Sequence, residues 1–132
     1  PIPDEKFDVV TILWTLENCQ DCMRMLRFAR ECLKPDGQLM VATGSRILVP
    51  FKKPMSKYFS ANPADMHCFR FSSRTLASAL HVSGFELKGP ANRYRDSDVL
   101  VLIGSPAEPN YHCADNPQEV LDFFKSWSEQ FP

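Results

Sequence analysis

The residues with the most evident chemistry are two cysteines spaced as Cys19-Gln-Asp-Cys22. This spacing occurs in redox pairs and in one half of a tetrahedral zinc site, and the zinc site needs a second close pair of Cys or His ligands. The other candidates, His67-Cys68 and His112-Cys113, are adjacent residues and lack such a spacing. We therefore expect no metal site, and we interpret the first two cysteines as inward-packing residues at a helix start.

Arg46 and His67 are candidates for contact with a substrate. A guanidinium such as that of Arg46 either neutralises an anionic substrate or is simply solvated in a loop. The imidazole of His67 can act as a general base near neutral pH, whereas a His without an identified acidic partner more often has a structural role. His67 is the one candidate for a catalytic residue, and the catalytic residues are otherwise unassigned.

A βαβ unit is expected to position these side chains. The apolar run Phe7–Leu13 is followed by a helical pattern over 22–33, a stop at Pro35-Asp-Gly37 and a second apolar run over 38–43. This order is typical of two parallel strands joined by a crossover helix. Because Phe7–Leu13 shows almost no polar alternation, we expect a central strand that is buried on both faces.

The segment Trp14-Thr-Leu-Glu17 follows the first strand, and ligands of open α/β sheets bind outside the carboxyl ends of the strands. Trp14 either lines such a ligand pocket or is only a core aromatic. By the same rule, Thr43-Gly-Ser-Arg46 faces the same crevice from the second strand. No glycine precedes Gly37, so a Gly-rich turn for phosphate or nucleotide binding is absent from this part of the sequence.

The stretch 44–68 loses all periodicity and contains Pro50, Pro54 and Pro63. A long connection without regular elements is typical of a lid or of a disordered segment. We predict that Pro50 to Pro63, together with Arg46 and His67, forms a movable cover over the crevice, and that its lysines form a solvated face rather than a nucleic-acid patch.

The remaining elements are a helix, a hairpin and a tail helix. Ser72 or Ser73 can cap a helix that runs to about Ser83, and two apolar runs over 85–88 and 99–104 are close enough to pair as a hairpin. Asn116 followed by Pro117 is a good helix start. The tail helix then presents an apolar stripe made of Val120, Leu121, Phe124, Trp127 and Phe131.

Composition excludes several classes of protein. The 132 residues suit one domain with a single core. The 15 basic and 16 acidic residues nearly balance, so the chain has no net positive charge that would attract nucleic acid. The longest apolar stretch, 99–103, is far shorter than the roughly 20 residues of a membrane-spanning helix, so we expect no membrane partner. Five cysteines at irregular spacing argue against a disulfide framework, and we expect a reducing, cytoplasmic location.

Four segments in this order resemble the distal half of a class I S-adenosylmethionine-dependent methyltransferase. They are Pro3-Asp-Glu-Lys-Phe-Asp-Val-Val10, Trp14-Thr-Leu-Glu-Asn18, Leu33-Lys-Pro-Asp-Gly-Gln-Leu39, and Phe71-Ser-Ser-Arg-Thr-Leu76 followed by Ser83-Gly-Phe-Glu86. The resemblance covers roughly residues 1–106. The family's Gly-rich first loop and the acidic residue that ends its second strand are expected upstream of Pro1.

This resemblance implies a three-layer Rossmann-like α/β fold, of which the chain supplies the C-terminal portion with parallel strands and a terminal antiparallel hairpin. It implies methyl transfer from S-adenosylmethionine to a small molecule, with Trp14 and Thr15 beside the methionine and sulfonium portion of the cofactor. It also places His67 on the loop before Phe71. Arg46, by its position after the second strand, and His67 are our candidate substrate contacts. We expect residues 1–106 to form half of the methyltransferase domain, residues 107–132 to form a linker and amphipathic helix, and the isolated chain to be inactive.

The alternative is a non-catalytic α/β module that recruits a partner through its exposed surfaces and tail helix. Both interpretations leave one edge of Phe7–Leu13 without a neighbouring strand, and unpaired edges are templates for association. We therefore predict homo-oligomers that form through this edge or through the C-terminal helix.

Overall fold

A computed structural model describes residues 2–44, 67–89, 99–110 and 116–130. Its elements in chain order are β1 (Phe7–Leu13), the short 3-10 helix η1 (Leu16–Asn18), α1 (Cys22–Cys32), β2 (Leu33–Gly44), α3 (Ser73–Val82), β3 (Phe85–Leu87), β4 (Val99–Pro106) and α4 (Pro117–Gln130). The predicted elements are all present within this part of the chain. The proposed cover over Pro50 to Pro63 lies outside the described residues.

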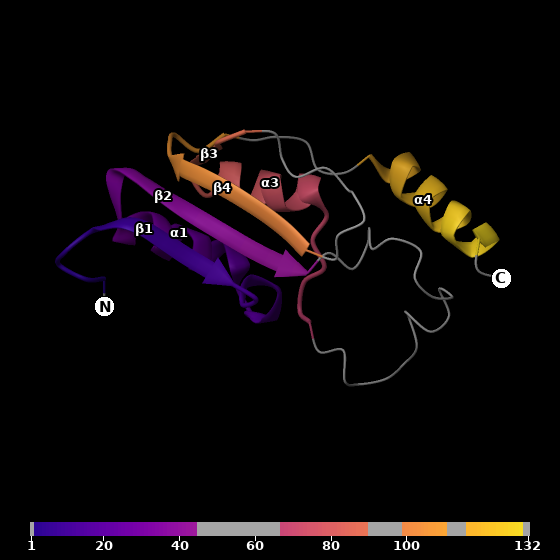
Figure 1. The fold of residues 1–132 in the computed structure, drawn as a ribbon, viewed down its shortest axis with the longest axis horizontal. Helices are drawn as coiled ribbons and strands as arrows, with labels where there is room; N and C mark the ends of the chain where they lie inside the picture. The colour runs from indigo at the N-terminus through magenta and orange to yellow at the C-terminus, as the bar shows by residue number, and fades with distance from the viewer. Residues whose placement is uncertain (1, 45–66, 90–98, 111–115, 131–132) are drawn as a thin grey trace.

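The four strands form one mixed sheet in the order β1-β2-β4-β3. Strands β1 and β2 are parallel, β2 and β4 are antiparallel, and β3 and β4 form the expected antiparallel hairpin. Helices α1 and α3 contact each other and cover the same face of the sheet, whereas α4 lies beyond the end of the sheet (Figure 1). The α/β fold with parallel strands and a terminal hairpin is thereby confirmed, with the sheet and one helical layer seen in the described residues.

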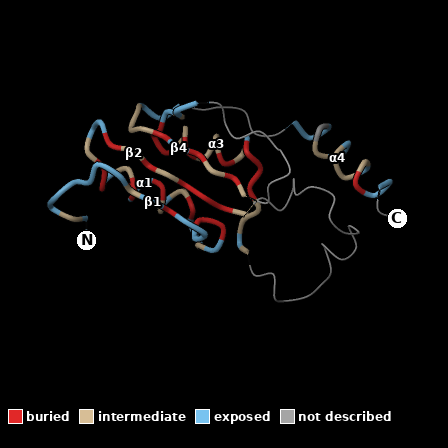
Figure 2. Tube along the Cα trace, viewed as in Figure 1, coloured by how far each residue is buried: buried red, intermediate tan, exposed pale blue. Residues whose placement is uncertain are grey.

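One core joins the two helices to the sheet. Its fully buried leucines include Leu26 of α1, Leu39 of β2, and Leu76 and Leu80 of α3. Figure 2 shows buried residues concentrated along β2 and β4, while much of β1 is exposed. The helical layer therefore covers the inner strands better than the outer strand β1.

The helix ends follow from local hydrogen bonds. Asp21 accepts a hydrogen bond from the Arg24 amide at 2.8 Å and caps α1, while Ser72 and Thr75 form a reciprocal capping box at the start of α3. Gly84 ends the turn after α3 with a φ of +83°, a conformation that favours glycine. The cap at Ser72 is one of the two that the sequence predicts for α3.

The prediction that Pro35-Asp-Gly37 stops the first helix was wrong by two residues. Strand β2 begins at Leu33, directly after α1, and its pairing with β1 shifts between Phe7 and Val9. A Cβ atom at Gly37 would lie 3.0 Å from the carbonyl oxygen of Phe7, so glycine permits the close approach of the two strands. Lys34 thus lies in β2 rather than at a helix end.

The prediction that β1 is central and buried on both faces is also not met by the described residues. Strand β1 is an edge strand, and of its seven residues only Ile12 is buried. Phe7, Val9 and Leu13 are 46%, 58% and 47% exposed because neither a neighbouring strand nor a second helical layer covers them within the described part of the chain. The expected unpaired edge is therefore present.

A groove of about 300 Å³ runs along this edge between β1 and α1. It is lined mainly by apolar side chains, among them Val10 and Leu13 from the strand and Met25 and Phe28 from the helix. The edge of β1 therefore continues into an apolar groove.

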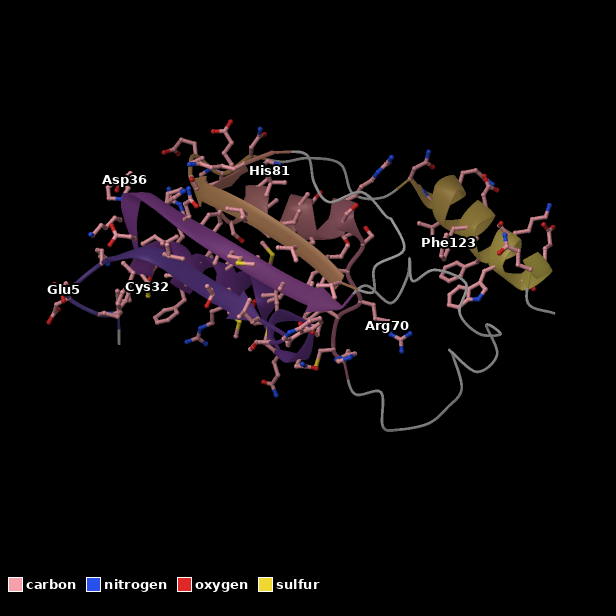
Figure 3. All side chains as sticks on the ribbon, in the orientation of Figure 1. Glu5, Cys32, Asp36, Arg70, His81 and Phe123 are labelled. Carbon is pink, nitrogen blue, oxygen red and sulfur yellow. The ribbon has the colours of Figure 1, made fainter. Side chains whose placement is uncertain are left out.

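At the other end of the chain, the tail helix α4 begins at the predicted cap, where Asn116 accepts a hydrogen bond from the Gln118 amide at 3.0 Å. Trp127 is fully buried and packs edge-on against Phe123, which Figure 3 labels on this helix. Leu121 is exposed rather than part of a buried stripe. No helix within the described ranges is long and apolar enough to cross a membrane.

The ion pair between Lys34 and Asp8 ties β2 to β1 at a Nζ–Oδ1 distance of 2.8 Å. The hydrogen bond and charge of Lys34 lower the pKa of the Asp8 carboxyl below its ordinary value. Because the folded-state pKa is depressed, the pair's small stabilisation is present above about pH 4 and is lost as the pH falls through that pKa.

We expect Lys34→Gln to raise the pKa of Asp8 toward its ordinary value, as measured by the pH dependence of the Asp8 carboxyl resonance in NMR. The control Lys125→Gln on α4 should leave that titration unchanged. An Asp8 pKa that does not respond to Lys34→Gln would mean that the pair does not form in solution.

Candidate functional site

The candidate site lies at the turn that follows β1. Among the described residues, Trp14 is the one non-glycine residue with a positive φ, 54°. The Trp14 amide donates to the Ala42 carbonyl at 2.9 Å, and the Trp14 carbonyl accepts from Asn18 Nδ2 at 3.2 Å. Because both sides of the residue are held, a conformation that is unfavourable for a bulky residue is maintained here.

Trp14 is 54% exposed and does not belong to the core that the described residues form. Thr15 follows it, and the Thr15 hydroxyl donates to the Leu13 carbonyl at 2.8 Å. That hydrogen bond leaves the hydroxyl oxygen with lone pairs that can accept from a ligand. The turn therefore presents an aromatic face and a hydroxyl at the carboxyl end of β1.

His67 is held at the same turn by Asn18. The Nδ1 atom of His67 lies 2.6 Å from Asn18 Oδ1. The side-chain Nδ2 of the same Asn18 donates to the Trp14 carbonyl. Since an amide oxygen only accepts, Nδ1 is the donor in this contact. The structure thus brings the Trp14 turn and His67 together through Asn18.

Two further bonds join the same segments. The Phe69 amide donates to the Glu17 carbonyl at 3.0 Å, and Cys68 Sγ donates to the Asn18 carbonyl at 3.6 Å. The residues 67–69 therefore lie alongside η1. Arg46, the other candidate substrate contact, lies outside the described residues.

Sequence reasoning missed two buried polar groups, on η1 and at the carboxyl end of β2. Glu17 is 3% exposed and Thr43 is fully buried, and neither Glu17 Oε2 nor Thr43 Oγ1 has a hydrogen-bond partner within the described residues. An unpaired buried polar atom costs about 1–3 kcal/mol. The signal that could have identified both residues is a polar side chain directly after an apolar run.

The cysteines of the Cys19-Gln-Asp-Cys22 motif face inward, as expected. Cys22 is buried at the start of α1, and burial raises the pKa of both thiols above their ordinary value. Within the described residues, no group of three or more His, Cys, Asp or Glu side chains is arranged to hold a metal ion.

Comparisons with known proteins agree with the geometry. The model of a family described as a methyltransferase domain matches residues 2–88, which include β1, the Trp14 turn, α1, β2, α3 and β3. The chain is 41% identical over 61 residues to the ubiquinone/menaquinone biosynthesis C-methyltransferase UbiE of Vibrio parahaemolyticus. It is 42% identical over 60 residues to the demethylmenaquinone methyltransferase of Listeria welshimeri.

These matches cover 46% and 45% of this chain but 22% and 25% of the two relatives, so the chain spans about a quarter of their length. A structure described as an S-adenosylmethionine-dependent methyltransferase from Thermotoga maritima, possibly a histamine N-methyltransferase, is similar in fold. Its TM-score is 0.60 at 22% identity, over 80% of this chain and 58% of that one. The matched family model covers well over half of the sequence, and the chain belongs to the methyltransferase domain family.

Proposed function

We propose that this chain forms the distal part of the catalytic domain of an S-adenosylmethionine-dependent methyltransferase that acts on a small molecule. The observation that carries the proposal is the family match over 2–88, because it includes the strand-end turn at which ligands of α/β sheets bind. Both curated relatives are named as methyltransferases of quinone compounds. Their similarity supports methyl transfer, and the matched part is too short to extend their substrate to this chain.

In this proposal Trp14 and Thr15 contact the methionine and sulfonium portion of the methyl donor. Trp14 offers a half-exposed indole face, which attracts a cation such as a sulfonium, and Thr15 offers hydroxyl lone pairs. When bound, S-adenosylmethionine supplies the methyl group as an electrophile. The chain's own contribution is alignment of that group with the acceptor.

His67 is proposed to lie on the acceptor side of the site. Its hydrogen bond with Asn18 holds the ring at the turn, where an imidazole can act as a general base toward the acceptor. Arg46 is proposed as a second acceptor contact, placed by the sequence at the end of β2. Together these residues form one wall of a site.

We propose that the other walls come from elsewhere, because the described residues contain no Gly-rich turn. The chain covers 58% of the similar Thermotoga structure, and the exposed edge of β1 marks where a further strand fits. We therefore propose that a further segment on the β1 side completes the sheet and the cofactor site.

This proposal predicts that the isolated 132-residue chain binds S-adenosylmethionine weakly or not at all in isothermal titration calorimetry. The same titration on the full product of the native gene is expected to show binding at least about tenfold tighter, equivalent to about 1.4 kcal/mol. Trp14→Ala in the full product should weaken binding. The control is Leu121→Ala, a substitution at an exposed residue of α4, which should leave binding of S-adenosylmethionine unchanged.

Low-micromolar binding by the isolated chain would show that the site is complete without a further segment. A full gene product that neither binds the cofactor nor transfers a labelled methyl group to any small-molecule extract would favour the non-catalytic interaction module. The two results are distinguishable because they are measured on different proteins. The first tests whether the isolated chain holds a complete cofactor site, and the second tests whether the full gene product has such a site at all.

A further inference from the structure

Three thiols gather at the Trp14 turn and its neighbouring segment. Cys22 is buried, Cys19 is half-buried and Cys68 is exposed, and all three are free. Cys19 and Cys22 belong to the motif at the start of α1, whereas Cys68 comes from the segment that leads to α3. The proposed methyl transfer uses none of them.

Backbone contacts place Cys68 beside Cys19. The Phe69 amide bonds to the Glu17 carbonyl at 3.0 Å, and Cys68 Sγ lies 3.6 Å from the Asn18 carbonyl oxygen, which belongs to the peptide group that joins Asn18 to Cys19. The contact between His67 and Asn18 holds the same two segments together. These contacts set the Cys68 sulfur against the peptide group that precedes Cys19, and the Cys68 group is close enough to contribute to the raised pKa of the Cys19 thiol.

We propose that Cys19 and Cys68 form a disulfide when the protein meets a peroxide. Exposure of Cys68 lets the oxidant reach its sulfur, which lies against the peptide group that joins Asn18 to Cys19. Cys22 is a poorer partner, since its side chain packs in the core with Leu26 and Ala29 and would have to leave that core. The proposed disulfide therefore joins the two segments, instead of joining the two cysteines of the Cys19-Gln-Asp-Cys22 motif.

The chemistry is balanced in two steps. Peroxide oxidises the Cys68 thiolate to a sulfenic acid, and the oxygen–oxygen bond breaks with release of one water. The Cys19 thiolate then attacks the Cys68 sulfur, the sulfur–sulfur bond forms, and the sulfenic oxygen leaves as a second water. A thiol reductant returns both residues to thiols.

The second step depends on the thiolate of Cys19. Burial, with the neighbouring Cys22 and Cys68 groups, raises the pKa of the Cys19 thiol. Formation of the disulfide should therefore become faster as the pH rises toward the pKa of the Cys19 thiol. Once formed, the bond would fix residues 67–69 covalently to the turn that carries Trp14, and so limit movement of His67 relative to it.

Peptide mapping by mass spectrometry after treatment with hydrogen peroxide tests the proposal, in a Cys113→Ser background that removes the cysteine outside the described residues. We expect a peptide that joins Cys19 to Cys68, lighter by two hydrogens than its reduced parts and lost on reduction. Cys68→Ser should abolish it. Cys22→Ser, the matched control, should retain it, with folding of each variant checked by circular dichroism.

A peptide that joins Cys19 to Cys22 would overturn the proposal. So would further oxidation of Cys68 to the sulfinic acid without any cross-link, because it would show that Cys19 does not reach the sulfur. If Cys22→Ser fails to fold, Cys32→Ser replaces it as a control at a buried cysteine away from the turn.

Discussion

Val9→Lys is expected to weaken the predicted self-association of this chain through the edge of β1. Val9 is 58% exposed on β1, whose outer edge has no partner strand among the described residues, and full burial of a valine contributes about 1.5–3 kcal/mol before the entropy of association is subtracted. Placing a charge there removes that contribution and opposes edge pairing. We expect the dissociation constant of the self-associated form to rise at least about tenfold, since 1.4 kcal/mol corresponds to that factor.

Analytical ultracentrifugation at micromolar concentrations is the measurement. Ile12→Lys is unsuitable for this purpose because Ile12 is 7% exposed and faces the core, so the variant would unfold. Leu121→Lys places the same charge on the exposed side of α4 and tests association through the tail helix instead. A wild-type chain that stays folded and monomeric would contradict both routes.

Leu26→Ala is expected to lower the free energy of unfolding by about 2–5 kcal/mol. Leu26 is fully buried where α1 meets the sheet, and the space left by its side chain would be enclosed by core residues of α1, β2 and α3. A loss of this size is a large fraction of the stability of a small domain. Urea unfolding followed by circular dichroism measures it.

The matched control is Phe28→Ala on the same helix. Phe28 is 45% exposed along the edge groove, so its truncation should cost about 1 kcal/mol or less. Both variants should be made in the Val9→Lys background, because self-association would otherwise add to the measured stability. Equal losses for the two variants would mean that the core is not organised around Leu26.

Local signals explain which parts of the fold could be predicted. Asp21, Ser72 and Asn116 each mark a helix start by a hydrogen bond within three residues, and Gly84 marks an end by its φ. The start of β2 could not be predicted in this way. It depends on how residues 33–38 pair with β1 across an irregular register, and pairing with a distant strand overrides the local stop signal.

The same distinction applies to the candidate site. Trp14 and Thr15 could be placed from the sequence because they directly follow an apolar run. The link between Asn18 and His67 could not, because 49 positions separate them and only the folded chain brings them together. The roles of these residues in binding remain predictions, and Arg46 lies outside the described part of the chain.

The contrast between the two tryptophans gives this protein two natural fluorescent reporters. Trp14 stands half in solvent at the candidate site, whereas Trp127 is fully enclosed on α4. Emission from an indole in water lies at longer wavelength and is quenched more readily by small solutes than emission from an enclosed one. Quenching by a small solute therefore distinguishes a change at the Trp14 turn from a change in the packing of the tail helix, without any added label.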